Sequence, residues 1–395
     1  MSIKLSQRVQ AVKPSPTLAI TARAAELRAA GKDVIGLGAG EPDFDTPDHI
    51  KEAAIQAIHD GKTKYTPVDG TAELKQAVIE KFRRDNGHEY AAEQILVSCG
   101  GKQSFYNLAQ ALLDPGDEVI IPAPYWVSYP DMTILAGGIP VYIRAGAAQQ
   151  FKIMPEQLAA AITDKTRLLV LNSPSNPTGM AYTRAELEAL GDVLRQYPNI
   201  LVATDDMYEH ILWSDEPFCN ILMACPDLYD QTMVLNGVSK AYSMTGWRIG
   251  YAGGPADIIR SMKKIQSQST SNPTSISQAA AVAALNGPQD AIGTMLKAFR
   301  ERHDYVVERL NGMKGIECLP TDRTFYVFPN IEGMIETTDG VSNDLEMGEY
   351  LIENAGVAVV PGSAFGLGGH MRISIATGMD ALEKALDRIE KVVNG

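Results

Sequence analysis

The sequence has little cysteine, no excess of positive charge and no long apolar run. Only four cysteines occur in 395 residues, and none forms a C-x-x-C pair, which excludes a disulfide scaffold. The 35 basic and 48 acidic residues give a net charge of −13, which disfavours general binding to nucleic acid or anionic lipid. No stretch is long enough to span a bilayer, and the first residues lack a signal-peptide core. We therefore expect a soluble, cytoplasmic protein with no nucleic-acid or membrane partner.

Metal-ligand spacing is also missing from the sequence. None of the six histidines is spaced from another as zinc ligands are, so we predict no metal site. Any anionic ligand must instead be bound by a few well-placed Lys and Arg side chains, because the overall charge repels it.

From about residue 50 to 290, helical periodicity alternates with short apolar runs. Runs such as ILV at 95–97 and LLVL at 168–171 are apolar on consecutive residues, as in parallel strands covered by helices on both faces. A capping box formed by Thr183 and Glu186 predicts the start of one helix. The fold class is therefore α/β, with a mostly parallel sheet covered by helices on both faces.

The alternating pattern of helices and apolar runs ends near both ends of the chain. After about residue 290, a long amphipathic stretch and several short strands predict a smaller α+β domain. Near the N-terminus we expect an extended segment and then a helix over 22–30. We therefore predict an N-terminal arm and part of the small domain at 1–45, a large domain at 46–290 and a small C-terminal domain at 291–395.

Several polar motifs follow directly after predicted strands, where parallel sheets bind ligands. Gly100 and Gly101 open a helix whose N-terminus can hold an anion. Lys240 follows a buried run, and burial there would depress the pKa of its amine and make it nucleophilic. The other residues placed in this way are Trp126, Asn176, Asp205, Tyr208, Ser239 and Arg248.

Each of these signals has an ordinary structural alternative. Paired glycines often form a turn, Trp126 could be core, Asp205 could cap a helix, and Lys240 could be a solvated loop residue. Together, however, they supply an amine, a carboxylate, an aromatic side chain that can stack on a flat ring, and a helix N-terminus that can bind a phosphate. That combination predicts a site for pyridoxal 5′-phosphate (PLP).

Motifs across nearly the whole chain carry a family resemblance. They are RVQAVKPSPT, GAGEPDFDTP, KTKYTPVDGTAELK, GGKQ, DPGDEVIIPAPYWVSYP, NSPSNPTG, SKAYSMTGWRIGYAGGP, VAVVPGSAFG and MRISIAT. With these motifs the sequence resembles the class I aminotransferases among the fold-type I PLP enzymes, and especially the bacterial aspartate aminotransferase subgroup. The resemblance implies that the large domain binds PLP.

The resemblance also implies a role for each motif residue. Lys240 would bind PLP through a covalent imine and then move the proton, while Asp205 would pair with the pyridine nitrogen and Tyr208 would hydrogen-bond the ring's 3-oxygen. Arg372 would bind the substrate α-carboxylate. The residues implied to bind the cofactor are Lys240, Gly101, Lys102, Gln103, Trp126, Asn176, Asp205, Tyr208, Ser239, Arg248 and, from the neighbouring subunit of a homodimer, Tyr65. Those implied to bind substrate are Gly40, Trp126, Asn176, Arg372, Lys102 and Thr17.

The expected reaction is a ping-pong transfer of an amino group from aspartate or glutamate to oxaloacetate or 2-oxoglutarate. In the subgroup, a lysine in GGKQ and residues of the KPSxT segment bind the distal carboxylate, and these positions are Lys102, Thr17 and Lys13 here. A lysine in the first turn of a helix opposes the helix dipole, which favours a nearby anion. The alternative is a prephenate or broad-specificity aromatic or alanine aminotransferase of the same family.

Two other classes of protein fit the sequence less well. A dinucleotide-dependent oxidoreductase is suggested by Gly36, Gly38 and Gly40, but their spacing is G-x-G-x-G and no helical pattern follows. An effector-sensing domain of a transcription factor would carry an N-terminal DNA-binding domain, for which the roughly 45 residues before the sheet leave no room.

Overall fold

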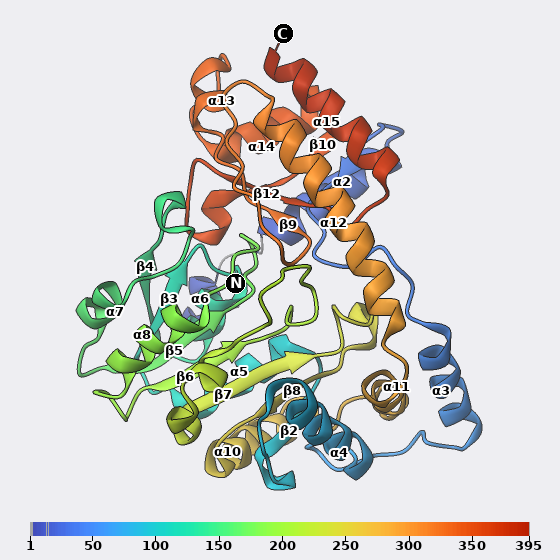
Figure 1. The fold of residues 1–395 in the computed structure, drawn as a ribbon, viewed down its shortest axis with the longest axis vertical. Coiled ribbons are helices and arrows are strands. Elements are labelled where there is room, and N and C mark those ends of the chain that lie inside the picture. The colour runs from blue at the N-terminus through green and yellow to red at the C-terminus, as the bar shows by residue number, and fades with distance from the viewer. Residues whose placement is uncertain (1–2, 13, 15, 395) are drawn as a thin grey trace.

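A seven-stranded sheet forms the centre of the larger half of the molecule (Figure 1). The computed structural model describes residues 3–12, 14 and 16–394. Strand β8 runs antiparallel to both of its neighbours, and the other strand pairs are parallel. In spatial order the strands are β2 (Ile95–Ser98), β8 (Gly250–Gly253), β7 (Thr232–Gly237), β6 (Leu201–Asp205), β5 (Thr166–Asn172), β3 (Glu118–Ala123) and β4 (Ile139–Arg144).

Helices cover both faces of this sheet. In β3, Val119 and Ile121 pack in one buried cluster with Phe105, whereas Ile120 between them packs in another with Leu187. Because both faces exclude water, consecutive residues of a strand are apolar, as the sequence indicates. The helices of this half are α3 (Asp48–His59), α4 (Ala72–Lys81), α5 (Gly101–Leu112), α6 (Ser128–Leu135), α7 (Pro155–Ala161), α8 (Arg184–Leu194), α9 (Ile221–Ala224), α10 (Ala256–Ser267) and α11 (Ser275–Asn286).

The smaller half combines the C-terminal part of the chain with an N-terminal segment. Ile35 pairs in parallel with Val357, so residues far apart in the sequence share a two-stranded sheet. The long helix α12 (Asp290–Asn311) runs from the larger half into the smaller one (Figure 1). The other elements are β1 (Ile35–Gly36), β9 (Tyr326–Val327), β10 (Val357–Ala358), β11 (Val360–Pro361), β12 (Met371–Ser374), α13 (Glu332–Thr337), α14 (Asp344–Asn354) and α15 (Met379–Asn394).

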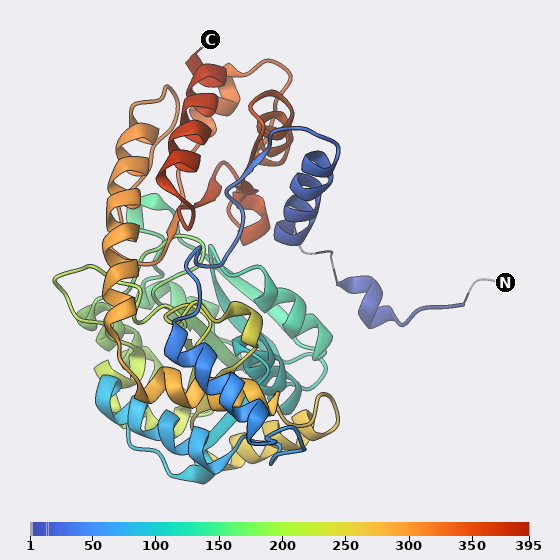
Figure 2. The same ribbon diagram turned by 90° about the vertical axis from the view of Figure 1, so that its right-hand side faces the viewer.

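The N-terminal arm lies along the outside of the molecule. Helix α1 (Gln7–Ala11) lies beside α6 at the edge of the molecule, and α2 (Pro16–Ala29) lies against the smaller half (Figure 2). The apolar side chains of Ile3 and Leu5 are exposed. Among the described residues, no helix combines the length and apolar character needed to cross a membrane.

Candidate active site

The carboxyl ends of the central strands meet one cavity of about 230 Å³. Asn172 ends β5 and lies beside Asp205, which ends β6. Lys240 follows the next strand, β7, and α5 begins close to all three. Thirteen of the sixteen lining residues come from the larger half. The lining residues are Gly40, Gly101, Lys102, Trp126, Val127, Ser128, Asn172, Asn176, Asp205, Met207, Tyr208, Ser239, Lys240, Arg248, Tyr326 and Arg372.

Asp205 is the carboxylate of this cavity. Its Oδ2 accepts a hydrogen bond of 2.5 Å from the Tyr129 hydroxyl, and its Oδ1 accepts one of 3.3 Å from the Met207 N–H. The Asn172 amide donates to the Asp205 carbonyl at 2.9 Å, so the residue is held at its backbone as well. Burial raises the pKa of Asp205, and the hydrogen bonds from Tyr129 and Met207 partly oppose that rise.

Lys240 is the amine of the cavity. Its Nζ donates to the carbonyl oxygen of Gly40, which belongs to the segment leading out of β1. Burial lowers the pKa of Lys240 to about 8, and Arg372 and Arg248 act in the same direction, whereas Glu41 opposes them. A larger share of this amine is therefore neutral near pH 7 than in an ordinary lysine.

The N-terminus of α5 and Arg248 form a pocket suited to an anion. Gly100 has a φ of +86°, which favours glycine, and a Cβ added there would lie 2.3 Å from Nη2 of Arg248 and displace the guanidinium. The Arg248 guanidinium donates to the carbonyl oxygens of Thr245 and Cys99 at 2.8 and 3.4 Å. Free N–H groups at a helix N-terminus beside a guanidinium attract phosphate.

Two further cations face the cavity. The Lys102 ammonium lies 5.1 Å from the centroid of the Trp126 ring, and burial together with the charge of Arg248 lowers the pKa of Lys102. Arg372 is buried and donates to Asn176 Oδ1 at 2.8 Å and to the Gly38 carbonyl at 2.6 Å. Its Nε has no hydrogen-bond partner within the described part of the chain.

Some residues of the cavity wall are not among those predicted from sequence. Tyr326 lies under the Arg372 guanidinium at 4.5 Å, and its hydroxyl is 3.0 Å from that of Tyr208. Asn172 ends a parallel strand, as Asp205 does. Because ligands bind at the carboxyl ends of parallel strands, the sequence pattern could have identified Asn172 as well. No comparable signal marks Tyr326, because its strand lies in the smaller half.

Two predicted positions, Gln103 and Tyr65, lie outside the cavity. The Gln103 side chain accepts from the Cys99 N–H at 2.7 Å and donates to Thr270 at 2.7 Å, so it ties the start of α5 to neighbouring loops. Tyr65 is 93% exposed and borders a separate groove between α3 and α11. Lys13 and the side chain of Thr17 fall outside the described residues.

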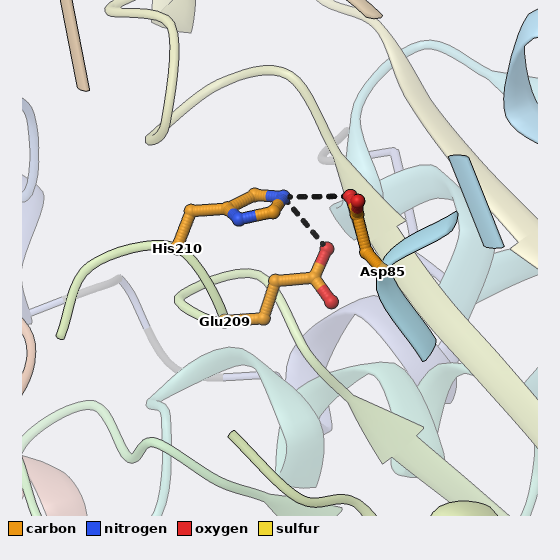
Figure 3. A group of neighbouring side chains, drawn as sticks. All are labelled: Asp85, Glu209 and His210. Atoms are coloured by element: carbon orange, nitrogen blue, oxygen red, sulfur yellow. Dashed lines mark ion pairs between the residues drawn. The ribbon is translucent and has the colours of Figure 1, made fainter. Parts of the chain in front are cut away.

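A group of three side chains, Asp85, Glu209 and His210, has the spacing of metal ligands (Figure 3). The Nε2 atom of His210 lies 3.3 Å from both Asp85 Oδ2 and Glu209 Oε1. The buried Lys81 ammonium, however, already pairs with Glu209 and lies 3.9 Å from Asp85. With that cation in place the two acids are compensated, and the group serves as an ion-pair network that anchors the segment after β6.

Comparisons with known proteins agree with this geometry. The family model "Aminotransferase class I and II" matches residues 32–389. An aspartate/prephenate aminotransferase of Nitrosomonas europaea is 60% identical over 99% of this chain and 100% of its own length. A second one, from Cereibacter sphaeroides, is 55% identical over 99% of both chains.

Solved structures give the same result at the level of the fold. The aspartate aminotransferase of Rhizobium meliloti superposes with a TM-score of 0.96 at 48% identity, covering 100% of this chain and 99% of that one. The Thermus thermophilus aspartate aminotransferase with maleate superposes with a TM-score of 0.93 at 44% identity, covering 99% and 100%. The chain is therefore a transaminase and belongs to the class I and II aminotransferase family, in the branch of aspartate aminotransferases that depends on PLP.

Proposed function

We propose that the cavity binds PLP and transfers the amino group of aspartate or glutamate to a 2-oxo acid such as oxaloacetate or 2-oxoglutarate. When bound, PLP supplies an aldehyde that carries the amino group and a ring that withdraws electrons from the substrate Cα. The residues present fit this group: a cavity with an amine of depressed pKa, a carboxylate across from it and an anion pocket with no space for a Cβ.

Each residue of the cavity then has a distinct task. Lys240 holds the cofactor through its amine and, once released by substrate, moves the proton at Cα. Asp205 keeps the ring nitrogen protonated, because a negative charge beside it favours the charged form. Trp126 covers one face of the ring and excludes water. Tyr208 and Asn176 lie at the cavity wall, where they can hydrogen-bond the ring's 3-oxygen.

The anionic groups of cofactor and substrate are bound separately. The N-terminus of α5, with Gly101, Ser239 and Arg248, binds the phosphate. Arg372 binds the α-carboxylate, since its planar fork can donate two parallel hydrogen bonds. Gly40 contributes its backbone beside Lys240.

A second cation carries the preference for dicarboxylic substrates. Lys102 lines the same cavity as Arg372 and has no carboxylate partner in the described part of the chain, so it is available to a second substrate carboxylate. The Thermus thermophilus relative was solved with maleate, which is a dicarboxylate. Prephenate is the second candidate acceptor, because it also carries two carboxylates and appears in the names of the Nitrosomonas and Cereibacter relatives.

A substrate panel tests this proposal. We expect kcat/KM for aspartate and glutamate to exceed that for alanine and phenylalanine, with prephenate measured beside the two dicarboxylic 2-oxo acids. Lys102→Met should lower kcat/KM for the dicarboxylic substrates by about tenfold or more, since a charged hydrogen bond is lost. Alanine should be little affected, and Lys297→Met on the exposed face of α12 serves as the control. Equal turnover of alanine and aspartate by the unaltered enzyme would contradict the preference.

We also propose that the enzyme is a cytoplasmic homodimer in which Tyr65 reaches the phosphate bound by the partner. The groove beside Tyr65 has a volume of about 840 Å³ and is bordered by α3 and α11. Helix α3 also exposes Ile55 and Ile58, at 53% each, and exposed apolar side chains next to a groove favour a protein contact. The four cysteines are free, as suits a reducing compartment.

A further inference from the structure

Behind Asp205, on the side away from the cavity, lies a buried tyrosine. Tyr129 is 1% exposed and does not line the cavity, so it touches neither substrate nor cofactor. Its hydroxyl donates to Asp205 Oδ2 at 2.5 Å, the shorter of the two hydrogen bonds on that carboxylate. Burial, with the nearby charge of Asp205, raises the pKa of Tyr129 well above its usual value, so the hydroxyl stays protonated and acts as a donor.

The position of Tyr129 is fixed by its own helix and by contacts with Trp126 and Phe105. The Tyr129 N–H bonds to the Trp126 carbonyl at 3.1 Å, and the two rings meet edge to face at 5.1 Å. Phe105 of α5 packs on the other side at 4.9 Å. One short segment therefore holds both Trp126, which is proposed to stack on the ring, and Tyr129, which bonds to the Asp205 carboxylate.

We propose that Tyr129 is a positioning residue that fixes the Asp205 carboxylate as the hydrogen-bond acceptor for the ring nitrogen of PLP. The proposal rests on the PLP site proposed above. The Tyr129 hydroxyl on Oδ2 and the Met207 N–H on Oδ1 together restrain rotation of the carboxylate, and Oδ1, which carries the longer of the two bonds, can still accept from the ring nitrogen. The Tyr129 hydroxyl also reduces the basicity of Asp205, so that the shared proton stays on the ring nitrogen and does not move to the carboxylate.

Other groups around Asp205 do not provide this support. The charge of Lys240 acts on Asp205 from across the cavity and also lowers its pKa. The neighbouring Asp206 carboxylate is bound to Thr204 and Asn220 at 2.7 and 2.6 Å. Tyr208 bonds to Tyr326, and the Asn172 amide bonds to the backbone of Asp205. Loss of the Tyr129 hydroxyl would therefore leave Oδ2 without a donor in the described part of the chain.

The test is a pH titration of the visible absorbance of the PLP-loaded protein. In Tyr129→Phe the shared proton should move toward Asp205, and the ring loses positive charge. The nitrogen that links Lys240 to the cofactor then becomes more basic, so its spectroscopic pKa should rise by about one unit, as expected for one hydrogen bond to a charged group. The affinity of the apoprotein for PLP should fall about tenfold.

Tyr182→Phe is the matched control. Tyr182 is also a buried tyrosine of the larger half, and its hydroxyl accepts from the Ile153 N–H at 2.9 Å, away from the cavity. Its variant should lose stability without a shift in the titration. An unchanged or lowered spectroscopic pKa in Tyr129→Phe, or the same shift in both variants, would overturn the proposal. If the unaltered protein takes up no PLP and stays colourless, the proposed function itself fails, and the two failures are distinguishable.

Discussion

Burial and four nearby charges set the reactivity of the Lys240 amine. Burial is the largest influence and favours the neutral form; Glu41 and Asp205 favour the ammonium, and the positive charges of Arg372 and Arg248 act against it. The result is a pKa of about 8, against 10.5 for an ordinary lysine. Only the neutral amine attacks an aldehyde, so this shift makes the residue usable close to neutral pH.

The depressed pKa of Lys240 predicts how fast the apoprotein takes up PLP. Below pH 8 the amine is mostly protonated, so the rate of attachment should rise about tenfold per pH unit and then level off above about 8. Stopped-flow absorbance after mixing apoprotein with PLP measures this rate, and Lys240→Ala provides the blank. A rate that keeps rising toward pH 10.5 would mean that the amine is solvated.

Single residues also show what sequence alone can predict about the site. Asp205 and Lys240 could be placed because each stands at or just after the end of a buried strand, and Arg248 because it follows Lys240 in the same segment; the cavity brings the three together. Tyr129 and Tyr326 could not, because their roles depend on contacts with residues 76 and 118 positions away along the chain. Long-range partners of this kind leave no local pattern.

At the scale of elements, strands were easier to predict than helix ends. The apolar run LLVL falls within β5, and the capping box at Thr183 and Glu186 begins α8 as expected. The helix expected over 22–30, however, is α2 and begins at Pro16. Proline is tolerated in the first turn of a helix, where its missing N–H would have no partner, so it does not force an extended segment there.

One connecting segment links the two halves at the cavity. The segment from Gly38 to Thr46 offers carbonyls to Arg372 and Lys240. From α12 of the smaller half, Arg302 binds both oxygens of Asp43 at 2.7 and 2.9 Å. On the side of the larger half, Thr46 donates to the Ser243 carbonyl at 2.6 Å and accepts from Trp247 at 3.0 Å.

Breaking the Arg302–Asp43 pair should therefore affect both stability and activity. The Arg302 side chain is 10% exposed and also lies over the Phe44 and Phe299 rings, so Arg302→Gln should lower the free energy of unfolding by about 2 kcal/mol. The loosened segment should also lower kcat, because the Gly40 carbonyl no longer holds Lys240 in place.

Urea unfolding and steady-state kinetics of this variant measure the two effects. Arg300→Gln, on the exposed face of the same helix, is the control and should change neither quantity. If Arg302→Gln loses stability but keeps the full kcat, the Arg302–Asp43 pair does not contribute to catalysis.

At the scale of the whole molecule, the sequence predicted two unequal parts and the participation of the N-terminus in the smaller one. The parallel pairing of Ile35 with Val357 supports that prediction for the residues near 35. The bounds at residues 45 and 290 stay a prediction, because the segment from Gly38 to Thr46 contacts both halves and α12, which begins at Asp290, runs from one half into the other. Assembly with a second copy is likewise a property that no single chain contains.

The proposed sharing of sites between subunits can be tested with mixed dimers. If Tyr65 serves the partner, a hybrid of a Tyr65→Ala subunit with a Lys240→Ala subunit has one site with both residues intact. Each parent dimer would be impaired at both sites, so subunit exchange in an equal mixture should bring activity up to about a quarter of the unaltered enzyme.

The reciprocal mixture makes this test independent of protein stability. Unaltered subunits mixed with a Tyr65→Ala, Lys240→Ala double variant form hybrids in which the one remaining Lys240 faces a partner without Tyr65. Exchange should then reduce activity below the sum of the two unmixed samples. If Tyr65 served its own subunit, the first mixture would gain nothing and the second would lose nothing, because every Lys240 would keep the Tyr65 of its own chain. Tyr65 is 93% exposed and borders a groove. If it completes the partner's site, activity rises in the first mixture and falls in the second, and a site contained within one subunit would produce neither change.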